Sequence, residues 1–579
     1  MRSPREIAFR LKQELANLLL WRFPPSLATT PRPPKLTPAI EQLLSTAHAT
    51  EIVRLADDIL RHHFPIFGGI LETGPEIRWR RDYVHQIETG TPYFRRVPYL
   101  DFARVGDHKY IWELNRHQHL VVLAQAYRLT ARAAYLREAQ TQLTHWLAEN
   151  PPLRGINWNS ALEVAFRALS WASLDALAGA GLPDDFRQVL ANALYLHGCF
   201  LERNLSVYFS PNTHVLGEAV ALHTLGTLYP DFPQSPRWQA LGNKIVEEQI
   251  ERQVRDDGSH FEQSTYYHVY ALDMFLWHDL LAETSAPYKA KLQRMAEYLA
   301  ALLGPGETIP LIGDDDGGRF FPPYVERSRP APRQNRSRLF RDSGTAIMAT
   351  DNIQIVIKAG GFGPGSAGHS HSDVLSFVCR RGPNWWLVDS GTYSYLDPEW
   401  RNRFRGSAAH NTIRIDHKDQ ATPVGPFRWA NPPQVRILDW SSTGSRDSLD
   451  AECRYSGFIH RRRFLFQKPD VLFILDCVEG PPGEHLVEQF WHAAHPDTFL
   501  QMAFSHQSEA IETWQSEVFG SKYVAPGRLV TYRGPLQITL AAAISFHTPP
   551  EHLTIAGDTS QVTLALLLRD GTTVQCPVN

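Results

Sequence analysis

The sequence predicts a chain of two parts, an α domain built of helical hairpins followed by an antiparallel β domain. In the first part, apolar residues recur at helical spacing in one segment after another. Pro322 to Arg338 is rich in proline and arginine, as linkers are. Beyond it, short β-favouring runs alternate with turn residues. We therefore expect an α/α toroid at 1–325, a linker at 326–338 and an antiparallel β-sandwich domain at 339–579.

The composition excludes several classes of protein. The chain has 579 residues, of which 43% are hydrophobic, so it is long enough for more than one domain. Lys and Arg number 58 and Asp and Glu 61, a net charge of -3 that gives no global footprint for nucleic acid or a membrane surface. The five cysteines are scattered and form no CxxC pair. They are most simply buried thiols of a reducing compartment.

The N-terminal region carries no recognisable export signal. Its most apolar run, Leu15 to Phe23, is interrupted by Asn17 and Arg22 and is far shorter than the ~20 residues of a membrane span. No small-residue cleavage site follows closely. We expect a cytoplasmic protein, and the sequence leaves secretion by another route open.

The expected elements follow in chain order. Helices are predicted at 36–63, 116–130, 132–149, 159–179, 184–204, 212–228, 236–254, 262–283 and 287–303. Strands are predicted at 346–349, 353–358, 374–379, 385–389, 412–415, 434–438, 471–477, 529–532, 538–543 and 561–568. Repeated antiparallel helix pairs favour a toroid or solenoid over a four-helix bundle. No strict period supports a named repeat, and we expect any site at the junction of the two domains.

The β domain holds the densest cluster of chemically active residues. His369 and His371 lie two apart after a glycine-rich approach, and Asp389 and His410 follow. On a strand, His369 and His371 would share a face. Imidazoles and a carboxylate suit zinc or another first-row divalent metal. Isolated HxH pairs are more often ordinary surface or junction residues, but the glycines indicate close backbone packing here.

The α domain holds a second cluster. Ser210 is a candidate N-cap with Pro211 at the first helical position, so Asn212 and His214 would lie in a first turn that favours an anionic ligand. Asn212 alone is more simply a capping residue. The segment 257–268 enters the next long helix and contains two adjacent tyrosines, which are usually packing residues.

These segments together resemble the heparinase II/III-like polysaccharide lyases, a superfamily that includes heparin, chondroitin and alginate lyases. The resemblance covers most of the chain and depends on the order of its segments. They are Trp112–Arg116, Asn159–Arg167, Asn212–Glu218, Glu262–His268, Gly313–Arg319 and Gly360–Asp416. The fold it implies, an α/α toroid followed by an antiparallel β-sandwich, agrees with the elements expected above.

The resemblance also implies a reaction and its residues. Such enzymes cleave uronate-containing polysaccharides by β-elimination, removing the proton at C5 while the glycosidic oxygen leaves C4. Tyr267 matches the family's catalytic tyrosine, with Tyr266 as the fallback, and His369 matches the histidine facing the substrate. The metal triad implied is His371, Asp389 and His410, binding one divalent ion that is structural. We expect zinc first, then manganese or calcium.

One departure from the family pattern concerns the carboxylate of the substrate. Relatives place asparagine directly before histidine, whereas Thr213 separates Asn212 from His214, so either residue is a candidate to neutralise the carboxylate. The sequence-based candidates for further substrate contact are Arg116, Arg167, Arg405, Trp112 and Tyr266. The arginines could equally be structural, and Trp112, like Trp158, could simply fill the helical core.

Two other functional classes compete with a lyase. A glycoside hydrolase on the same toroid needs two opposed carboxyl groups, for which Glu163, Glu262 and the run 314–316 are the candidates. A non-catalytic glycan-binding protein would have lost the tyrosine, histidine and triad together. We expect an anionic polysaccharide partner, most simply a glycosaminoglycan, with alginate or another bacterial uronate polymer as the alternative. The sequence does not fix the polymer, its sulfation, endo or exo action, or the oligomeric state.

Overall fold

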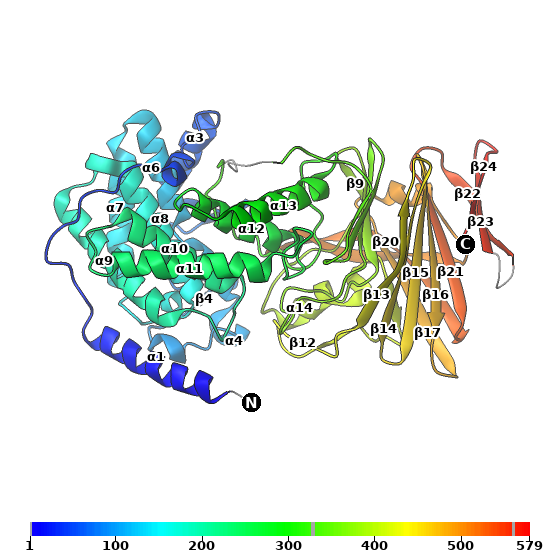
Figure 1. Ribbon diagram of the computed structural model, residues 1–579, viewed down its shortest axis with the longest axis horizontal. Coiled ribbons are helices and arrows are strands. Elements are labelled where there is room, and N and C mark those ends of the chain that lie inside the picture. The colour runs from blue at the N-terminus through cyan, green and yellow to red at the C-terminus, as the bar shows by residue number, and fades with distance from the viewer. Residues whose placement is uncertain (1–2, 326–330, 558–561, 579) are drawn as a thin grey trace.

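The computed structural model describes residues 3–325, 331–557 and 562–578 and divides the chain into a helical domain and a β domain lying end to end (Figure 1). The predicted linker 326–338 falls partly on residues 326–330, which lie outside the described residues. Its described remainder has no regular structure until a strand begins at Arg338. None of the helices in the described ranges has the length and apolar character needed to cross a membrane.

The helical domain agrees with the expected segments from residue 116 onward to within a few residues. Its helices are α1 (Pro4–Arg22), α2 (Pro38–Glu41), α3 (Ala49–Ile59), α4 (Phe102–Val105), α5 (His108–Asn115), α6 (Gln118–Thr130), α7 (Ala133–Glu149), α8 (Ala161–Ala178), α9 (Asp184–Asn204), α10 (Thr213–Leu228), α11 (Ser235–Gln253), α12 (Thr265–Asp279) and α13 (Ala286–Leu303). The sequence missed α1, α4 and α5. It also missed four short strands, β1 (His63–Ile66), β2 (Gly69–Glu72), β3 (Arg81–Asp82) and β4 (Ile87–Glu88).

Helix α8 lies at the centre of the helical domain. Every residue from Leu162 to Ala178 is buried, including the charged Glu163, Arg167 and Asp175. It packs against α6, α9 and α10, and one continuous core contains apolar side chains from nearly all of these helices. The start of α8 and the N-termini of α10 and α12 therefore have fixed positions.

The β domain consists of antiparallel sheets. Its strands are β5 (Arg338–Phe340), β6 (Thr345–Ala349), β7 (Ile353–Lys358), β8 (Ser376–Arg381), β9 (Asn384–Leu387), β10 (Ile413–Ile415), β11 (Thr422–Pro423), β12 (Trp429–Ala430), β13 (Gln434–Ser442), β14 (Arg446–Tyr455), β15 (Phe458–Gln467), β16 (Val471–Glu479), β17 (Glu484–His492), β18 (Met502–Phe504), β19 (Ser508–Val518), β20 (Ser521–Pro535), β21 (Ile538–Ser545), β22 (Pro550–Gly557), β23 (Val562–Leu568) and β24 (Thr573–Pro577). One helix, α14 (Pro398–Arg405), interrupts them. The larger sheets have the orders β5-β6-β7-β8-β9, β10-β17-β20-β19 and β13-β14-β15-β16-β21-β18.

The six-stranded sheet is buried on both faces. Phe464 and Ile474 belong to the core shared with the sheets of β5–β9 and β10-β17-β20-β19. Leu465 and Phe473, their neighbours in sequence, point the opposite way, into a core under the sheet β22-β23-β24. Alternation along a strand places successive side chains on opposite faces. The sheet β22-β23-β24 therefore adds a further layer to the antiparallel β-sandwich that the sequence predicted.

The outer face of the sheet β5–β9 packs against α13. Tyr298 and Leu302 of α13 share a buried cluster with Phe340 and Val356, and the hydroxyls of Tyr298 and Thr345 lie 2.9 Å apart. This contact joins the domains and brings the loop between β7 and β8 against the helical domain. The five cysteines are free, and all except Cys477 are buried.

Candidate active site at the domain junction

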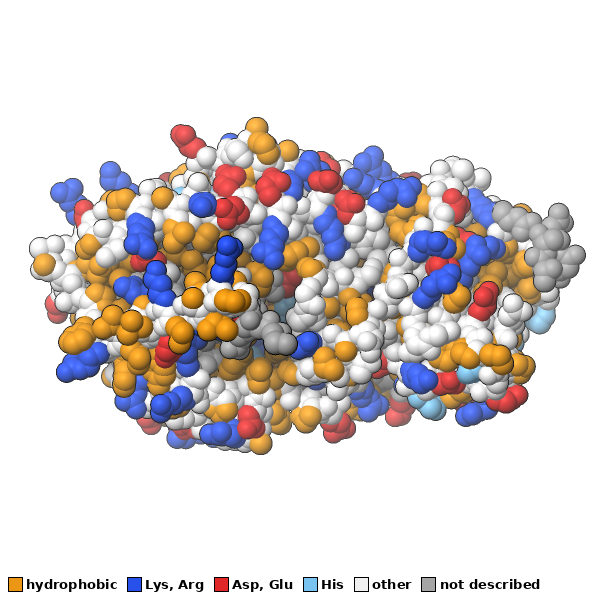
Figure 2. Space-filling model, turned by 60° about the horizontal axis from the view of Figure 1, so that its bottom comes forward, with side chains coloured by type: hydrophobic (Ala, Val, Ile, Leu, Met, Phe, Trp, Pro, Cys, Tyr) orange, Lys and Arg blue, Asp and Glu red, His pale blue; other side chains and the backbone are white. Residues whose placement is uncertain are grey.

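A cavity of about 920 Å³ lies between the two domains. Its walls come mostly from the helical domain, including α1, the starts of α10 and α12, and the segment 205–212. The β domain contributes the loop 363–369 together with Tyr395 and Phe427. Helix α1 borders the cavity, and its outer side carries many of the hydrophobic side chains seen on the face of the molecule in Figure 2. Residues from distant parts of the sequence thus meet in one concave space, as binding sites require.

Tyr267 lies at the start of α12 and faces the cavity. The hydroxyl of Ser264, the N-cap, accepts a hydrogen bond from Tyr267 N at 3.1 Å, which fixes this first turn. Tyr267 Oη donates to Asp316 Oδ2 at 3.1 Å and lies 3.2 Å from Tyr395 Oη. Burial, followed by the charge of Asp316, raises the pKa of Tyr267 well above its ordinary value. The residue is therefore a neutral phenol at neutral pH.

His369 stacks on Tyr267, with ring centroids 3.7 Å apart and planes inclined by 21°. Its Nδ1 lies 3.1 Å from Asp314 Oδ2 and its Nε2 lies 3.4 Å from Glu262 Oε2. Burial acts to lower the pKa of His369, but the Asp314 hydrogen bond and the charges of Glu262 and Asp314 outweigh it and raise that pKa. The imidazole of His369 is therefore held between the carboxylates of Asp314 and Glu262 and against the ring of Tyr267.

The segment of His369 and His371 is a loop and not the strand predicted from the sequence. It lies between β7 and β8 and has no ladder partner. His369 lines the cavity, whereas His371 is fully buried. The expected close approach of the glycines is present, because a Cβ on Gly363 would lie 3.0 Å from the backbone oxygen of Glu262.

The N-terminus of α10 differs from the prediction by two residues. Asn212, not Ser210, is the N-cap, and its side-chain oxygen accepts from His214 N at 3.1 Å. Asn212 Nδ2 and Thr213 N donate to the two oxygens of Glu262, at 2.9 and 3.2 Å. The first-turn donors that we expected to meet an anionic ligand therefore bind a carboxylate of the protein itself.

His214 also lines the cavity. Burial, followed by the charge of His369, lowers the pKa of His214 to about 4. Its imidazole is therefore neutral at pH 7 and retains one N–H donor. Because the amide of Asn212 already donates to Glu262, His214 is the less committed of the two candidates for a substrate carboxylate.

A buried ion-pair network forms the floor beside Tyr267. Lys109 Nζ lies 3.2 Å from both Glu113 Oε2 and Asp316 Oδ2. Arg116 donates to Glu163 through Nε at 2.7 Å and Nη2 at 2.8 Å. Burial acts to raise the pKa of Asp316, but the charges of Lys109 and Arg116 outweigh it, so that pKa is lowered. Asp316 is therefore an ionised acceptor for the phenolic proton of Tyr267.

The side chains of His371, Asp389 and His410 come together in the β domain. One potential ligand atom from each lies within 4.8 Å of the others, and all three residues are buried. Asp389 Oδ2 is 2.8 Å from His410 Nδ1. Among the described residues, His371 Nδ1 and His410 Nε2 are buried without a hydrogen-bond partner. Two imidazoles with unused nitrogens beside a carboxylate fit a divalent ion such as zinc.

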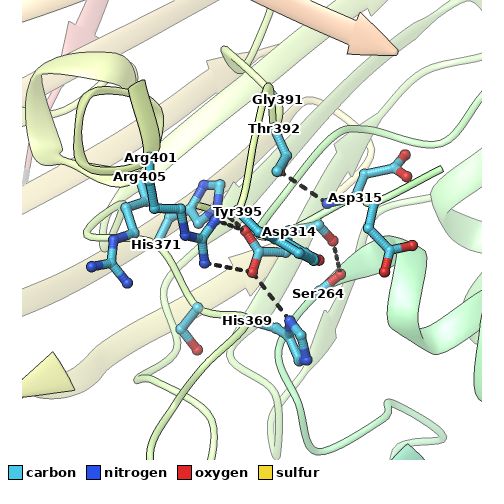
Figure 3. A network of polar contacts seen from close by, with 12 residues as sticks. Ser264, Asp314, Asp315, His369, His371, Gly391, Thr392, Tyr395, Arg401 and Arg405 are labelled. Carbon is cyan, nitrogen blue, oxygen red and sulfur yellow. Dashed lines mark hydrogen bonds and ion pairs between the residues drawn. The ribbon is translucent and has the colours of Figure 1, made fainter. Parts of the chain in front are cut away.

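Asp314 connects His369 with His371, a member of this triad (Figure 3). Its carboxylate is fully buried and contacts His369, His371 and Arg401. The neighbouring Asp315 instead accepts from Gly317 N and donates its own N–H to Thr392. Asp314 and Asp315 therefore belong to a polar cluster between the domains, which speaks against using this run as the carboxyl pair of a hydrolase.

Three of the sequence-based substrate contacts do not line the cavity. Arg167 is fully buried, hydrogen-bonds to His197 and Asn157, and does not line the cavity. Arg405 is 1% exposed and binds backbone oxygens of 425 and 426. The ring of Tyr266 packs on other tyrosines and is also absent from the lining. The sequence suggested these three residues because their side-chain types can bind a glycan. In the structure they instead make contacts within the protein.

The remaining sequence-based candidates line the cavity. Trp112 does so while its indole N–H donates to Ile156 O at 3.1 Å, whereas Trp158 is buried in the helical core. Arg116 also lines the cavity, although Glu163 occupies its guanidinium. The same cavity is also lined by Asn212, His214, Tyr267 and His369.

Sequence reasoning missed Tyr395 and Lys109 as parts of the site, and it considered Asp316 only as a carboxyl group of a hydrolase. Tyr395 follows the triad residue Asp389 by six positions, which was the one local signal for it. Its backbone N–H donates to Asp107 Oδ2 at 2.9 Å, so the helical domain fixes its position. The cavity-lining role of α1 gave no sequence signal, because no single apolar stripe marks that helix.

Comparison with known proteins gives a consistent family and fold. Residues 34–319 match the family described as "Heparinase II/III N-terminus", and residues 332–564 match "Heparinase II/III-like, C-terminal". A heparin-sulfate lyase of Bacteroides stercoris is 24% identical over 490 residues, which are 74% of this chain and 68% of the relative. A heparin-sulfate lyase of Pedobacter heparinus is 23% identical over 448 residues, which are 69% of this chain and 65% of the relative.

Solved structures resemble the whole chain. A crystal structure of heparinase III superposes with a TM-score of 0.69 at 16% identity, covering all of this chain and 98% of the other. A mutant of the heparan sulfate lyase HepC from Pedobacter heparinus gives a TM-score of 0.59 at 19% identity, covering 99% and 94%. At these identities the likeness shows the fold, an α domain followed by an antiparallel β domain.

Proposed function

Because the chain belongs to the heparinase II/III-like lyase superfamily, we propose that it cleaves a uronate-containing polysaccharide by β-elimination and that its substrate is a glycosaminoglycan of the heparan sulfate type. The observation that carries the proposal is the meeting of Tyr267, His369 and the N-terminus of α10 in one cavity. The names of the similar lyases favour a glycosaminoglycan over alginate.

The hydrogen bonds of Tyr267 suggest how its hydroxyl takes a proton. A phenol has one donor hydrogen, and Tyr267 gives it to the ionised Asp316. Tyr395 must then be the donor in the contact between the two phenols. One lone pair of Tyr267 Oη is left for the cavity, where it can meet the C5 hydrogen of a bound uronate.

The elimination step balances through these groups. The C5 proton passes to Tyr267 Oη while the phenolic proton passes to Asp316 Oδ2. The C5–H electron pair forms the C4–C5 double bond as the C4–O bond breaks. The departing oxygen takes a proton from Tyr267, and Asp316 returns its proton to the phenol. This relay needs no preformed phenolate, which suits the raised pKa of Tyr267.

The carboxylate of the uronate needs a partner as negative charge develops. We assign this role to the neutral imidazole of His214, with Asn212 shaping the helix start through its cap and its bond to Glu262. A divalent ion on His371, Asp389 and His410 would supply structural cross-linking of the β domain. It would thereby hold the loop that carries His369.

The positive charges that line the cavity limit how many sulfate groups the substrate can carry. Arg10 and Arg95 line it but pair with glutamates of α1, and the deeper Lys109 and Arg116 are also paired. Each sulfate group would require a cation to bind it. Among the described residues, Arg252 is the one lining arginine or lysine without an ion pair within 4 Å. With so little uncommitted positive charge, the cavity favours a chain with uronate carboxylates and few sulfates over densely sulfated heparin.

The hydrolase alternative lacks its pair of carboxyl groups. Glu163 is held bidentately by Arg116, and Glu262 is occupied by the start of α10. Neither is placed as a free general acid, which inverting hydrolysis requires. These contacts favour elimination.

A product analysis tests the proposal. The protein is incubated with heparan sulfate, chondroitin sulfate, hyaluronan and alginate, and products are followed by ultraviolet absorbance and mass spectrometry. Elimination gives an unsaturated uronate at the new non-reducing end and no added water. Saturated products that incorporate labelled oxygen from water would refute a lyase, and cleavage of alginate alone would refute the glycosaminoglycan substrate. We also propose that the enzyme is cytoplasmic and acts on imported oligosaccharides, which cell fractionation tests.

A further inference from the structure

We propose that Asp314 is a positioning residue that sets the orientation of His369 and also prepares His371 to bind the metal. The inference rests on the lyase function proposed above. Asp314 touches neither the cavity nor the reacting groups of the mechanism, yet its carboxylate is fully buried. Its contacts show what it holds.

Each oxygen of Asp314 carries one histidine contact and one arginine contact. Oδ2 lies 3.1 Å from His369 Nδ1 and accepts from Arg401 Nη2 at 2.8 Å. Oδ1 lies 2.9 Å from His371 Nε2 and accepts from Arg401 Nη1. A carboxylate with four such neighbours has no free lone-pair site, so neither imidazole can turn without losing its bond.

An ionised carboxylate only accepts hydrogen bonds, so both histidines must donate to it. His369 therefore carries a proton on Nδ1, and its Nε2 faces Glu262 and the cavity. His371 carries its proton on Nε2, which leaves the lone pair of Nδ1 for a metal. Among the described residues that nitrogen has no hydrogen-bond partner. One carboxylate thus fixes the direction of both rings and selects the tautomer of His371, as outer partners of metal ligands do.

The backbone around Asp314 also contacts the elements that carry His369 and Tyr267. Asp314 N donates to His369 O at 3.0 Å, and the hydroxyl of Ser264, the N-cap of α12, donates to Asp314 O at 2.6 Å. Gly313 has φ +73°, and a Cβ there would lie 2.8 Å from His369 O. The same segment therefore contacts the helix of Tyr267 and the loop of His369, which belong to different domains.

The test compares Asp314→Asn with Asp315→Asn in the full-length protein. The amide of Asp314→Asn would present N–H to a histidine or arginine donor, so we expect kcat to fall about 10- to 100-fold with KM within about threefold. Asp315 contacts neither histidine, and Asp315→Asn should keep kcat within about twofold. Elemental analysis should find less divalent metal in Asp314→Asn than in the wild type and in Asp315→Asn.

A double-mutant cycle with His369→Ala separates positioning from general stability. If Asp314 acts through His369, adding Asp314→Asn to His369→Ala should lower kcat by less than about threefold more. The positioning of His369 would be overturned if the two substitutions lowered kcat independently, so that their fold-changes multiplied in the double variant. A wild-type kcat in Asp314→Asn would overturn it as well. Equal metal content in all variants, or no stoichiometric metal in the wild type, would overturn the preparation of His371.

Two further outcomes have definite meanings. If Asp314→Asn does not fold, Arg401→Lys replaces it in the cycle, because it loosens Asp314 while keeping the charge pair. The same non-additive fall in kcat is expected, and additivity again refutes the inference. Absence of unsaturated products from the wild type would refute the proposed lyase function, whereas an active wild type with an equally active Asp314→Asn refutes only the role of Asp314.

Discussion

Glu218 makes the stability of the helical domain depend on pH. It is fully buried in α10, and its oxygens accept hydrogen bonds from Ser206 N at 2.7 Å and Ser206 Oγ at 2.6 Å. Burial raises the pKa of Glu218 to about 8, and the two Ser206 bonds only partly oppose this. Ser206 belongs to the segment 205–212, which forms a wall of the cavity. The carboxyl of Glu218 therefore supports the site without touching it.

The sign of the effect follows from the two pKa values of Glu218. Between about pH 4.5, the unfolded value, and about pH 8, the folded protein binds one proton more than the unfolded chain, so stability falls as pH rises. Glu218→Gln stays neutral and can meet both Ser206 groups. The variant should exceed the wild type in stability by roughly 4 kcal/mol at pH 8 and by less than about 1 kcal/mol at pH 5.

The assay is thermal unfolding of both proteins from pH 5 to pH 8.5. For a domain of about 300 residues, roughly 4 kcal/mol corresponds to a Tm difference of about 6 °C at pH 8, shrinking to about 1 °C at pH 5. Other titrating groups are common to both proteins and cancel in the difference. A Tm difference that does not change with pH would refute the raised pKa. Activity should stay within about twofold, because the Ser206 bonds are kept.

Three further predictions concern the site. Tyr267→Phe removes one oxygen and should lower kcat at least about 100-fold with Tm and substrate affinity nearly unchanged; near-normal turnover would reject the tyrosine mechanism. His214→Ala should lower kcat/KM more than Asn212→Ala, as steady-state kinetics would show. Asn212→Ala should lose about 1 kcal/mol of stability with its helix cap, as melting curves would show. A larger fall in kcat/KM for Asn212→Ala than for His214→Ala would give the carboxylate role to Asn212. The purified protein should hold one equivalent of divalent metal, and chelation or Asp389→Ala should lower Tm; elemental analysis without stoichiometric metal, together with an unchanged Tm for Asp389→Ala, would reduce the triad to hydrogen-bonding residues.

The helices and the domain order were predictable because their signals are local. The spacing of Leu162, Ala165 and Leu169 predicts the helix α8 whatever surrounds it, and the structure buries that helix on all sides. The loop of His369 was not predictable in this way. The spacing of His369 and His371, two residues apart, is typical of a strand. Asp314, about 55 positions earlier, nevertheless determines where both imidazoles point.

Charged side chains were the hardest to place from the sequence. Arg167 and Arg116 both look suited to an anionic glycan, yet the guanidinium of Arg167 lies 4.5 Å from the Trp146 ring in the core, while Arg116 reaches the cavity. The sequence does not show which carboxylate or ring a long side chain will meet. Glu262 illustrates the same limit, because its partner Asn212 lies 50 residues away.

The site exists only where the two domains meet. Tyr267 and His214 come from the helical domain, and His369 and Tyr395 come from the β domain. Two buried carboxylates join these halves, because Asp107 accepts from Tyr395 N and Asp314 holds His369. Removing one partner of a buried charged contact leaves the other uncompensated, which is costly. The junction is therefore held together by the same contacts that aim the catalytic candidates, and a loosened junction would lose turnover before either domain lost its fold.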